Sequence, residues 1–142
     1  MKFFDLMKRA VNEAGLELTE LQYEQFIKYM RLLQEWNEKI NLTAITQPEE
    51  VIEKHFIDSL TILEQINNED NVIDVGTGAG FPGIPLAICS NAKFTLVDSL
   101  NKRINFLNQV KEKIDLKNVE LEHGRAEDLA KDKKYREKFD VA

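Results

Sequence analysis

The segment of the chain best suited to hold a ligand is the glycine-rich run Asp74–Gly83, DVGTGAGFPG. Glycines at 76, 78 and 80 let the backbone turn tightly and approach a ligand closely, because no Cβ atom intervenes. Asp98 follows Gly76 by 22 residues, close to the spacing of about 20 at which an acid accepts hydrogen bonds from both ribose hydroxyls. The pattern predicts a site for a ribose-containing cofactor, with Gly76, Thr77, Gly78 and Asp98 among its contacts.

The residues alone leave three interpretations of this run open. The first is a glycine-rich turn that holds no ligand. The second is a dinucleotide site, although a dinucleotide prefers G-x-G-x-x-G, and the spacing here is G-x-G-x-G closed by Pro82. The third is S-adenosylmethionine, whose cationic amino group suits the acid that precedes the loop, Asp74. A P-loop is excluded because Gly-Lys-Ser/Thr does not occur in the sequence. The motif favours S-adenosylmethionine over the dinucleotide.

The elements around the loop are expected to alternate between strand and helix. The period-2 run Val72–Val75 predicts a strand before the loop, and Pro82 and Pro85 fit the opening turn of a helix that begins near Gly83. Further strands are predicted at 93–98, 118–122 and from 139, and helices at 101–114 and 126–131. The helix at 101–114 turns Ile104, Leu107, Val110 and Ile114 inward. Such alternation predicts a parallel sheet.

Residues 1–66 are predicted to be helical. Apolar residues at helical spacing run from Phe3 to Ala14, and Gly15 ends that helix. Thr19 and Gln22 form a capping box that opens a second helix, and Thr46 with Glu49 forms another after which Pro48 begins a third. A fourth helical stretch is predicted from Ser59 to Ile66. The second helix is expected to bury one stripe, formed by Tyr23, Phe26, Ile27, Met30, Leu33 and Ile40.

Two regions are therefore expected, a helical region at 1–66 and a partial Rossmann-like domain at 67–142. The predicted fold class is α/β, a Rossmann-like fold preceded by helices. A doubly wound sheet needs strands on both sides of its switch point. Here the sheet is expected to be incomplete after about the fourth strand, as in a fragment of a longer protein.

Composition limits the class of protein. Hydrophobic residues make up 43% and charged residues 31%, which allows a packed core. The single cysteine, Cys89, excludes an internal disulfide and a cysteine-based metal site, and its apolar neighbours predict a buried side chain. The apolar run Ile84–Cys89 is too short to span a bilayer, and the N-terminus lacks a signal-peptide pattern. These features predict a cytoplasmic protein without a membrane partner.

The charge is distributed unevenly. The net charge is −6, but residues 1–70 carry 7 basic and 14 acidic residues whereas residues 71–142 carry 12 and 11. This balance gives no basic footprint for a nucleic acid. Lys102 and Arg103 lie at the start of a predicted helix, where the helix dipole disfavours cations, so they are candidate RNA-phosphate contacts or a solvated face. The basic residues between Lys131 and Lys138 are interleaved with acids and favour a solvated loop.

Four further polar or aromatic residues allow two interpretations each. His55, Asp58 and Ser59 would either line the mouth of a cleft or form a helix junction, with Asp58 capping a helix that begins at Ser59. None of the three is expected to be catalytic. Trp36 would either stack on a base or, as favoured for a residue near a helix end, join the core.

Several segments together resemble a known family. The run DVGTGAGFPGIPLAI followed by LVDSLNKRINFL is similar to the RsmG (GidB) family of 16S rRNA guanine-N7 methyltransferases, as are WNEKINLTAI at 36–45 and HFIDSL at 55–60. The resemblance covers nearly the whole chain, in order, and implies the Rossmann-like fold of a class I S-adenosylmethionine-dependent methyltransferase. It implies that Gly76 and Phe81 contact S-adenosylmethionine and that Asp98, Ser99 and Leu100 hold its ribose and adenine. Ala126 and Glu127 would lie beside the adenine ring.

The resemblance also implies a reaction and its partners. The substrate would be small-subunit ribosomal RNA or the ribosomal subunit, and the full-length protein would be a monomer. Guanine N7 carries a lone pair and no proton, so no catalytic residue is expected and in-line positioning would supply ~7–11 kcal/mol. The family has an arginine just after the fourth strand, in a segment that this sequence does not contain. A non-catalytic ribosome-docking module and an NAD-dependent oxidoreductase stay open as alternatives.

Overall fold

Three parallel strands form the sheet that carries the glycine-rich loop. The computed structural model of the protein describes residues 2–43 and 47–125. The strands are β1 (Asn71–Val75), β2 (Lys93–Asp98) and β3 (Val119–His123), hydrogen-bonded in the order β1-β2-β3. Val75 pairs with Val97 and Asp98 with His123, so the carboxyl ends of all three strands meet at one edge. The prediction of a parallel sheet is confirmed.

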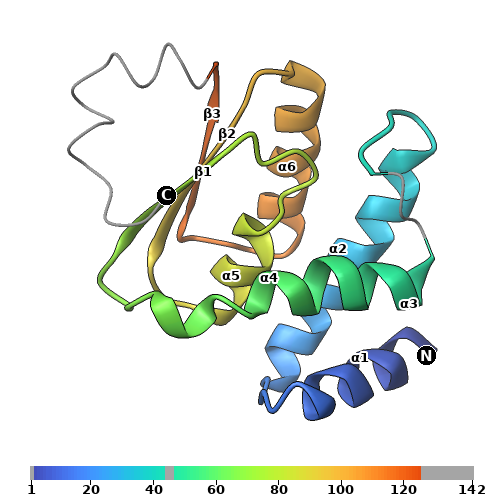
Figure 1. Cartoon of the computed structure of the whole chain (residues 1–142). Coiled ribbons are helices and arrows are strands. Elements are labelled where there is room, and N and C mark those ends of the chain that lie inside the picture. The colour runs from blue at the N-terminus through green and yellow to red at the C-terminus, as the bar shows by residue number, and fades with distance from the viewer. Residues whose placement is uncertain (1, 44–46, 126–142) are drawn as a thin grey trace.

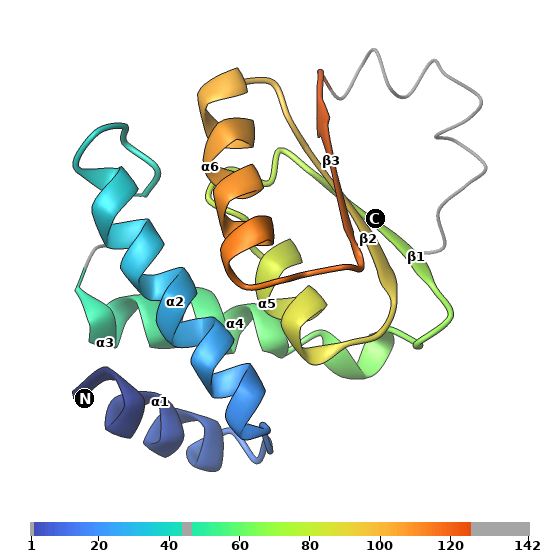
Figure 2. The same ribbon diagram turned by 180° about the vertical axis from the view of Figure 1, so that it is seen from behind.

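Two helices connect these strands and cover one face of the sheet. They are α5 (Gly83–Cys89) and α6 (Asn101–Lys113), and both views show them between the sheet and α2 (Figures 1 and 2). Alternate residues of β2, Phe94 and Leu96, join the core under these helices. The predicted inward residues of α6 are all buried, as expected for Ile104, Leu107, Val110 and Ile114.

One amide side chain ties the end of α5 to the sheet. Asn118, just before β3, lies with its Nδ2 2.9 Å from the carbonyl oxygens of Ser90 and Ala92 and 3.2 Å from that of Ala87. These carbonyls belong to the turn between α5 and β2 and to the last turn of α5. Asn118 therefore satisfies backbone acceptors that a short connection leaves without helical partners.

The first two helices begin and end where local chemistry predicts. They are α1 (Lys2–Glu13) and α2 (Glu20–Asn37). Gly15 has a φ of +73°, the left-handed conformation expected of a residue that ends a helix. Thr19 and Gln22 make both hydrogen bonds of the predicted capping box, at 3.1 and 2.8 Å.

The buried stripe of α2 differs from the prediction. Ile27 is only half-buried, and Ile40, also half-buried, lies beyond the end of the helix. Tyr29 is completely buried instead. The cause is that α2 contacts α1 on one side and both α5 and α6 on another, so its buried surface is wider than a single stripe.

The next helical segment is one continuous rod rather than two helices. It comprises α3 (Pro48–Val51), the π-helix η1 (Ile52–Ile57) and α4 (Asp58–Leu60), and a short 3-10 turn, η2 (Leu63–Gln65), follows. The predicted helix from Ser59 to Ile66 is therefore wrong, because the rod ends at Leu60. The N-cap of α3 is Gln47, without a side-chain hydrogen bond, and not Thr46, which lies outside the described residues.

The core continues from the amino-terminal helices into the layer under the sheet. It joins Met7 and Phe26 to Leu96 and Leu107, and Gln22 and Gln25 of α2 donate hydrogen bonds to the carbonyl oxygens of Ile88 and Ile114. Trp36 is half-buried, with its ring 5.8 Å from that of Phe106, in agreement with the core interpretation. The helix predicted at 126–131 and the strand predicted from 139 lie outside the described residues.

Two further expectations concern the apolar run of α5. Cys89 is half-buried rather than fully buried, and burial raises the pKa of its thiol to about 12, so the thiol stays protonated. In the described parts of the chain, no helix has the length and apolar character needed to cross a membrane.

Candidate cofactor site

The glycine-rich loop crosses from the end of β1 over the end of β2. The amides of Gly76 and Thr77 both donate to the carbonyl oxygen of Val97, at 2.8 and 3.0 Å. Gly76, Gly78 and Gly80 have φ values of +71°, +60° and +102°, which L-residues rarely adopt. A Cβ atom at Gly76 or Gly78 would meet no atom within 4 Å. The loop therefore presents bare backbone to open space on this side.

Asp98, the acid predicted to bind the ribose, lies directly against this loop. Its side chain is buried, and its Oδ2 accepts a hydrogen bond of 2.9 Å from the amide of Gly78. Its Oδ1 accepts another of 2.9 Å from the amide of Leu100. The carboxylate thus joins the two segments that the sequence placed at one site, the loop after β1 and the turn after β2.

Asp74, at the end of β1, is held by the other side of the loop. Its Oδ2 accepts hydrogen bonds from the Thr77 hydroxyl at 2.7 Å and from the amide of Gly83 at 3.1 Å. Burial raises the pKa of Asp74 to about 6, although both hydrogen bonds oppose the increase and the charge of Asp98 adds to it. A carboxyl group with a perturbed pKa beneath a ligand-sized loop is a candidate functional residue.

The predicted contact residues differ in how they face solvent. Gly76, Ser99 and Leu100 are exposed, whereas Gly78 and Phe81 are half-buried. Thr77 is buried, its hydroxyl binds Asp74, its amide donates to Val97, and its carbonyl accepts from Gly80 and Phe81, so Thr77 shapes the loop and presents no free polar group to a ligand. The predicted contacts Ala126 and Glu127 lie outside the described residues.

Sequence reasoning missed Tyr29, which reaches the loop from α2. Its hydroxyl donates a hydrogen bond of 2.6 Å to the carbonyl oxygen of Ala79, between the second and third glycines. The sequence contains a signal for its burial, because Tyr29 continues an i, i+3 series from Tyr23 and Phe26. The partner in the loop, fifty residues away, has no such local signal.

His55 packs on the loop as well. Its ring stacks on that of Phe81 at 4.3 Å and 8°, and its Nε2 lies 3.1 Å from the Thr43 hydroxyl. Burial lowers the pKa of His55, an effect that the charge of Asp58 opposes. The alternative of a helix junction capped by Asp58 is wrong, because Asp58 lies inside the continuous rod and makes no side-chain cap. Ser59 is buried, and its hydroxyl donates to the carbonyl oxygen of His55.

The two cations at the start of α6 have different surroundings. Lys102 is exposed. Arg103 turns toward the site, where its Nη1 lies 3.5 Å from Asp98 Oδ2, and one third of its side chain is exposed. Its Nε is buried and finds no hydrogen-bond acceptor in the described part of the chain. A donor in that position suits a site that takes a polar ligand.

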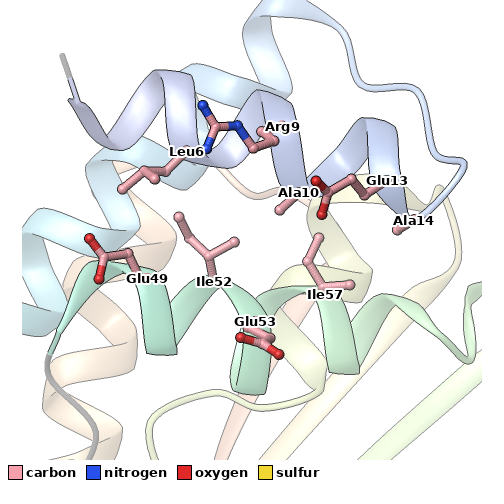
Figure 3. A pocket seen from close by; sticks show the side chains of 9 residues that line it. All are labelled: Leu6, Arg9, Ala10, Glu13, Ala14, Glu49, Ile52, Glu53 and Ile57. Atoms are coloured by element: carbon pink, nitrogen blue, oxygen red, sulfur yellow. The ribbon is translucent and has the colours of Figure 1, made fainter.

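A hollow of about 410 Å³, away from the glycine-rich loop, lies between α1 and the continuous rod (Figure 3). Leu6, Ala10, Ile52 and Ile57 provide apolar walls, and the rim carries three glutamates against one arginine, Glu13, Glu49, Glu53 and Arg9. An acidic rim repels phosphate groups. This hollow is therefore a poor place for a nucleotide or for RNA, in contrast to the start of α6.

Comparison with known proteins identifies the family. The family model described as GidB, rRNA small subunit methyltransferase G, matches residues 22–142. The chain belongs to this family. Over its whole length it is 60% identical to the Ribosomal RNA small subunit methyltransferase G of Clostridium botulinum (strain Eklund 17B / Type B). It is 56% identical to that of Clostridium perfringens (strain SM101 / Type A) and 57% identical to that of Clostridium beijerinckii. In each comparison the chain spans 61% of the relative's length.

Proposed function

We propose that the protein binds S-adenosylmethionine at the loop after β1 and takes part in methylating guanine N7 of small-subunit ribosomal RNA. The observation that carries the cofactor proposal is the pairing of Gly78 with Asp98, which brings the bare loop and the predicted ribose-binding acid to one place. The membership of the GidB family and the names of the relatives support the reaction and the substrate. A cytoplasmic location, where ribosomes are assembled, follows from the proposal.

The residues present fit the cofactor. Open space above Gly76 and Gly78 accepts a ligand against the backbone, and the ionised carboxylate of Asp74 suits a cationic amino group. Asp98, with the exposed Ser99 and Leu100, would hold the ribose and adenine. S-adenosylmethionine supplies an electrophilic methyl group when bound. The chain's own task is then to hold the cofactor in a fixed orientation, because guanine N7 needs no general base.

Calorimetric titration tests the cofactor. The complete protein is expected to bind S-adenosylmethionine saturably and more tightly than NAD, and Asp98→Ala is expected to weaken that binding at least tenfold, since it removes the bidentate acceptor. Glu112→Ala serves as the control, because it removes an exposed carboxylate near the far end of α6 and leaves Asp98 in place. Tighter binding of NAD would overturn the proposal in favour of an oxidoreductase, and binding of neither would leave a non-catalytic module.

We propose that RNA approaches the edge of the sheet near Lys102. The described residues of the amino-terminal helices carry an acidic hollow, whereas Lys102 is exposed beside the candidate cofactor site. A lysine or arginine that contacts a phosphate displaces a counterion from the nucleic acid. Each such contact therefore contributes to the affinity for RNA in a salt-dependent way. We expect the full-length protein to be a monomer, so no second copy would cover the edge of the sheet beside Lys102.

Charge reversal at Lys102 tests this approach. Lys102→Glu is expected to weaken binding of the complete protein to small-subunit ribosomal RNA about tenfold at low salt and to reduce the salt dependence, because a phosphate contact is lost. The matched control is Lys113→Glu, also exposed and at the other end of α6, roughly 16 Å away along the helix. Fluorescence anisotropy over a range of salt concentrations measures both. Equal losses for the two variants would show a diffuse charge effect and would contradict a contact at Lys102.

A further inference from the structure

The side chain of Tyr29 is the direct connection between α2 and the backbone of the glycine-rich loop. It is completely buried, and its hydroxyl donates a 2.6 Å hydrogen bond to the carbonyl oxygen of Ala79. Ala79 lies between Gly78, whose amide binds Asp98, and Gly80. The bond therefore acts on the part of the loop that faces the predicted ribose-binding acid.

The hydrogen bond has no simple replacement. Without the hydroxyl, the carbonyl oxygen of Ala79 would be buried without a hydrogen-bond donor, which costs its full desolvation free energy. The loop is therefore most stable in the conformation that places this oxygen against the hydroxyl. Burial, with a contribution from the charge of Asp74, keeps the pKa of Tyr29 well above its ordinary value. The hydroxyl accordingly keeps its proton and remains a donor at every pH at which the protein works.

Aromatic packing fixes the orientation of the hydroxyl. The Tyr29 ring stacks on Phe56 of η1 with a centroid distance of 5.4 Å and an angle of 19°, and lies 5.7 Å from the Phe81 ring of the loop. Phe81 is covered in turn by His55. Since η1 and α2 both contribute rings, the amino-terminal helices determine where the hydroxyl points.

The loop approaches Tyr29 so closely that only glycine fits at position 80. A Cβ atom there would lie 2.8 Å from the Tyr29 hydroxyl oxygen and 2.6 Å from Ile84 Cγ1. Gly78, two residues earlier, has open space at the equivalent point. The same loop thus has one face pressed on Tyr29 and another face free for a ligand.

We infer that Tyr29 is a positioning residue for the cofactor, which acts by holding the Ala79 carbonyl and thereby the backbone of Gly78 and Gly80. The inference rests on the proposed binding of S-adenosylmethionine at this loop. It makes the amino-terminal helical region part of the cofactor site, although none of its side chains is expected to contact the cofactor. A change in the position of α2 would accordingly change the affinity of the site.

Tyr29→Phe in the complete protein tests this role, because it removes the hydroxyl and keeps the ring. Two readouts are measured at a temperature where the variant is fully folded. The dissociation constant for S-adenosylmethionine is expected to rise about tenfold. The amides of Gly80 and Phe81, which both donate to the Thr77 carbonyl, are expected to exchange hydrogen about tenfold faster, while amides in the middle of α6 exchange as before.

Tyr23→Phe provides the matched control. Tyr23 is also buried on α2, but it packs edge-to-face on Phe4 of α1, at 5.5 Å and 79°, away from the loop. This variant is expected to leave both readouts unchanged. Unchanged affinity and unchanged loop exchange in Tyr29→Phe would overturn the inference and leave Tyr29 as core packing only. If the unsubstituted protein bound no S-adenosylmethionine, the proposed function would fail, and the exchange of Gly80 and Phe81 would still decide whether Tyr29 holds the loop.

Discussion

Replacing Asp74 with asparagine is expected to stabilise the ligand-free protein at pH 7 and to weaken binding of S-adenosylmethionine more than tenfold. Burial raises the pKa of Asp74 to about 6, against an ordinary value of 3.8. A neutral amide avoids the cost of an ionised group in this place. Its oxygen can still accept the hydrogen bonds from the Thr77 hydroxyl and the Gly83 amide, which both go to one carboxylate oxygen. The amide lacks the negative charge that would attract a cationic ligand.

The stabilisation expected of Asp74→Asn depends on pH, because proton binding by Asp74 is coupled to folding. A carboxyl whose pKa is higher in the folded than in the unfolded protein binds its proton more tightly when folded, so its contribution to stability is greatest below about pH 4. That contribution is lost as the pH rises to about 6 and stays lost above it. The shift of about two pKa units corresponds to about 3 kcal/mol, and partial solvation reduces the expected gain at pH 7 to about 1–2 kcal/mol.

Urea denaturation between pH 4 and pH 8 measures the effect. The free energy of unfolding of Asp74→Asn should equal that of the unsubstituted protein near pH 4 and exceed it increasingly up to about pH 6. Asp5→Asn, at an exposed position of α1, is the control and should show no such divergence. A variant that is less stable at pH 7 would show that the carboxylate stabilises the loop. In that case Asp74 would not be a residue that lowers the stability of the ligand-free protein in order to bind a ligand, as residues of functional sites commonly do.

Local chemistry made much of the fold predictable. The capping box at Thr19, the left-handed Gly15 and the alternation from β1 to β3 each depend on residues within a few positions of one another. The buried positions of α6 followed from its helical period. The two halves of the candidate site, Gly78 and Asp98, were also predictable together, because carboxyl ends of adjacent parallel strands meet at one edge.

Long-range packing was the part that the sequence did not reveal. Nothing near Tyr29 indicates that its hydroxyl meets the carbonyl of Ala79, and nothing near His55 indicates a stack on Phe81. The continuous rod from Pro48 to Leu60 was misread as two helices because a polar residue, Asp58, resembled an N-cap.

Alanine is expected to cost much more stability at Gly80 than at Gly78, although both glycines lie in the same loop. At Gly80, a Cβ atom would meet Ile84, Tyr29 and Leu107 at 2.6–3.0 Å, and the backbone has a φ of +102°. Gly80→Ala should therefore lower the free energy of unfolding by about 2–4 kcal/mol, from overpacking together with backbone strain. At Gly78 the φ is +60° and no atom lies within 4 Å of the added Cβ. Gly78→Ala should cost only about 1 kcal/mol of stability.

Gly78→Ala is expected to affect ligand binding more than stability. The Cβ of Gly78→Ala would point into the space proposed for S-adenosylmethionine, so binding should weaken more than tenfold although the protein stays folded. Urea denaturation and calorimetric titration of both variants separate the two quantities. Unaltered binding by Gly78→Ala would show that the cofactor does not lie against this face of the loop.

A double variant adds an internal check on the packing at Gly80. Because the Tyr29 hydroxyl oxygen is one of the three atoms that the Cβ would meet, Tyr29→Phe should cost less stability in the Gly80→Ala background than alone. Residues in contact are expected to show such non-additivity, of about 0.5–3 kcal/mol, whereas independent residues are not. Strict additivity would mean that the hydroxyl keeps its hydrogen bond to Ala79 in the Gly80→Ala protein and that Ile84 and Leu107, rather than Tyr29, give way to the methyl group.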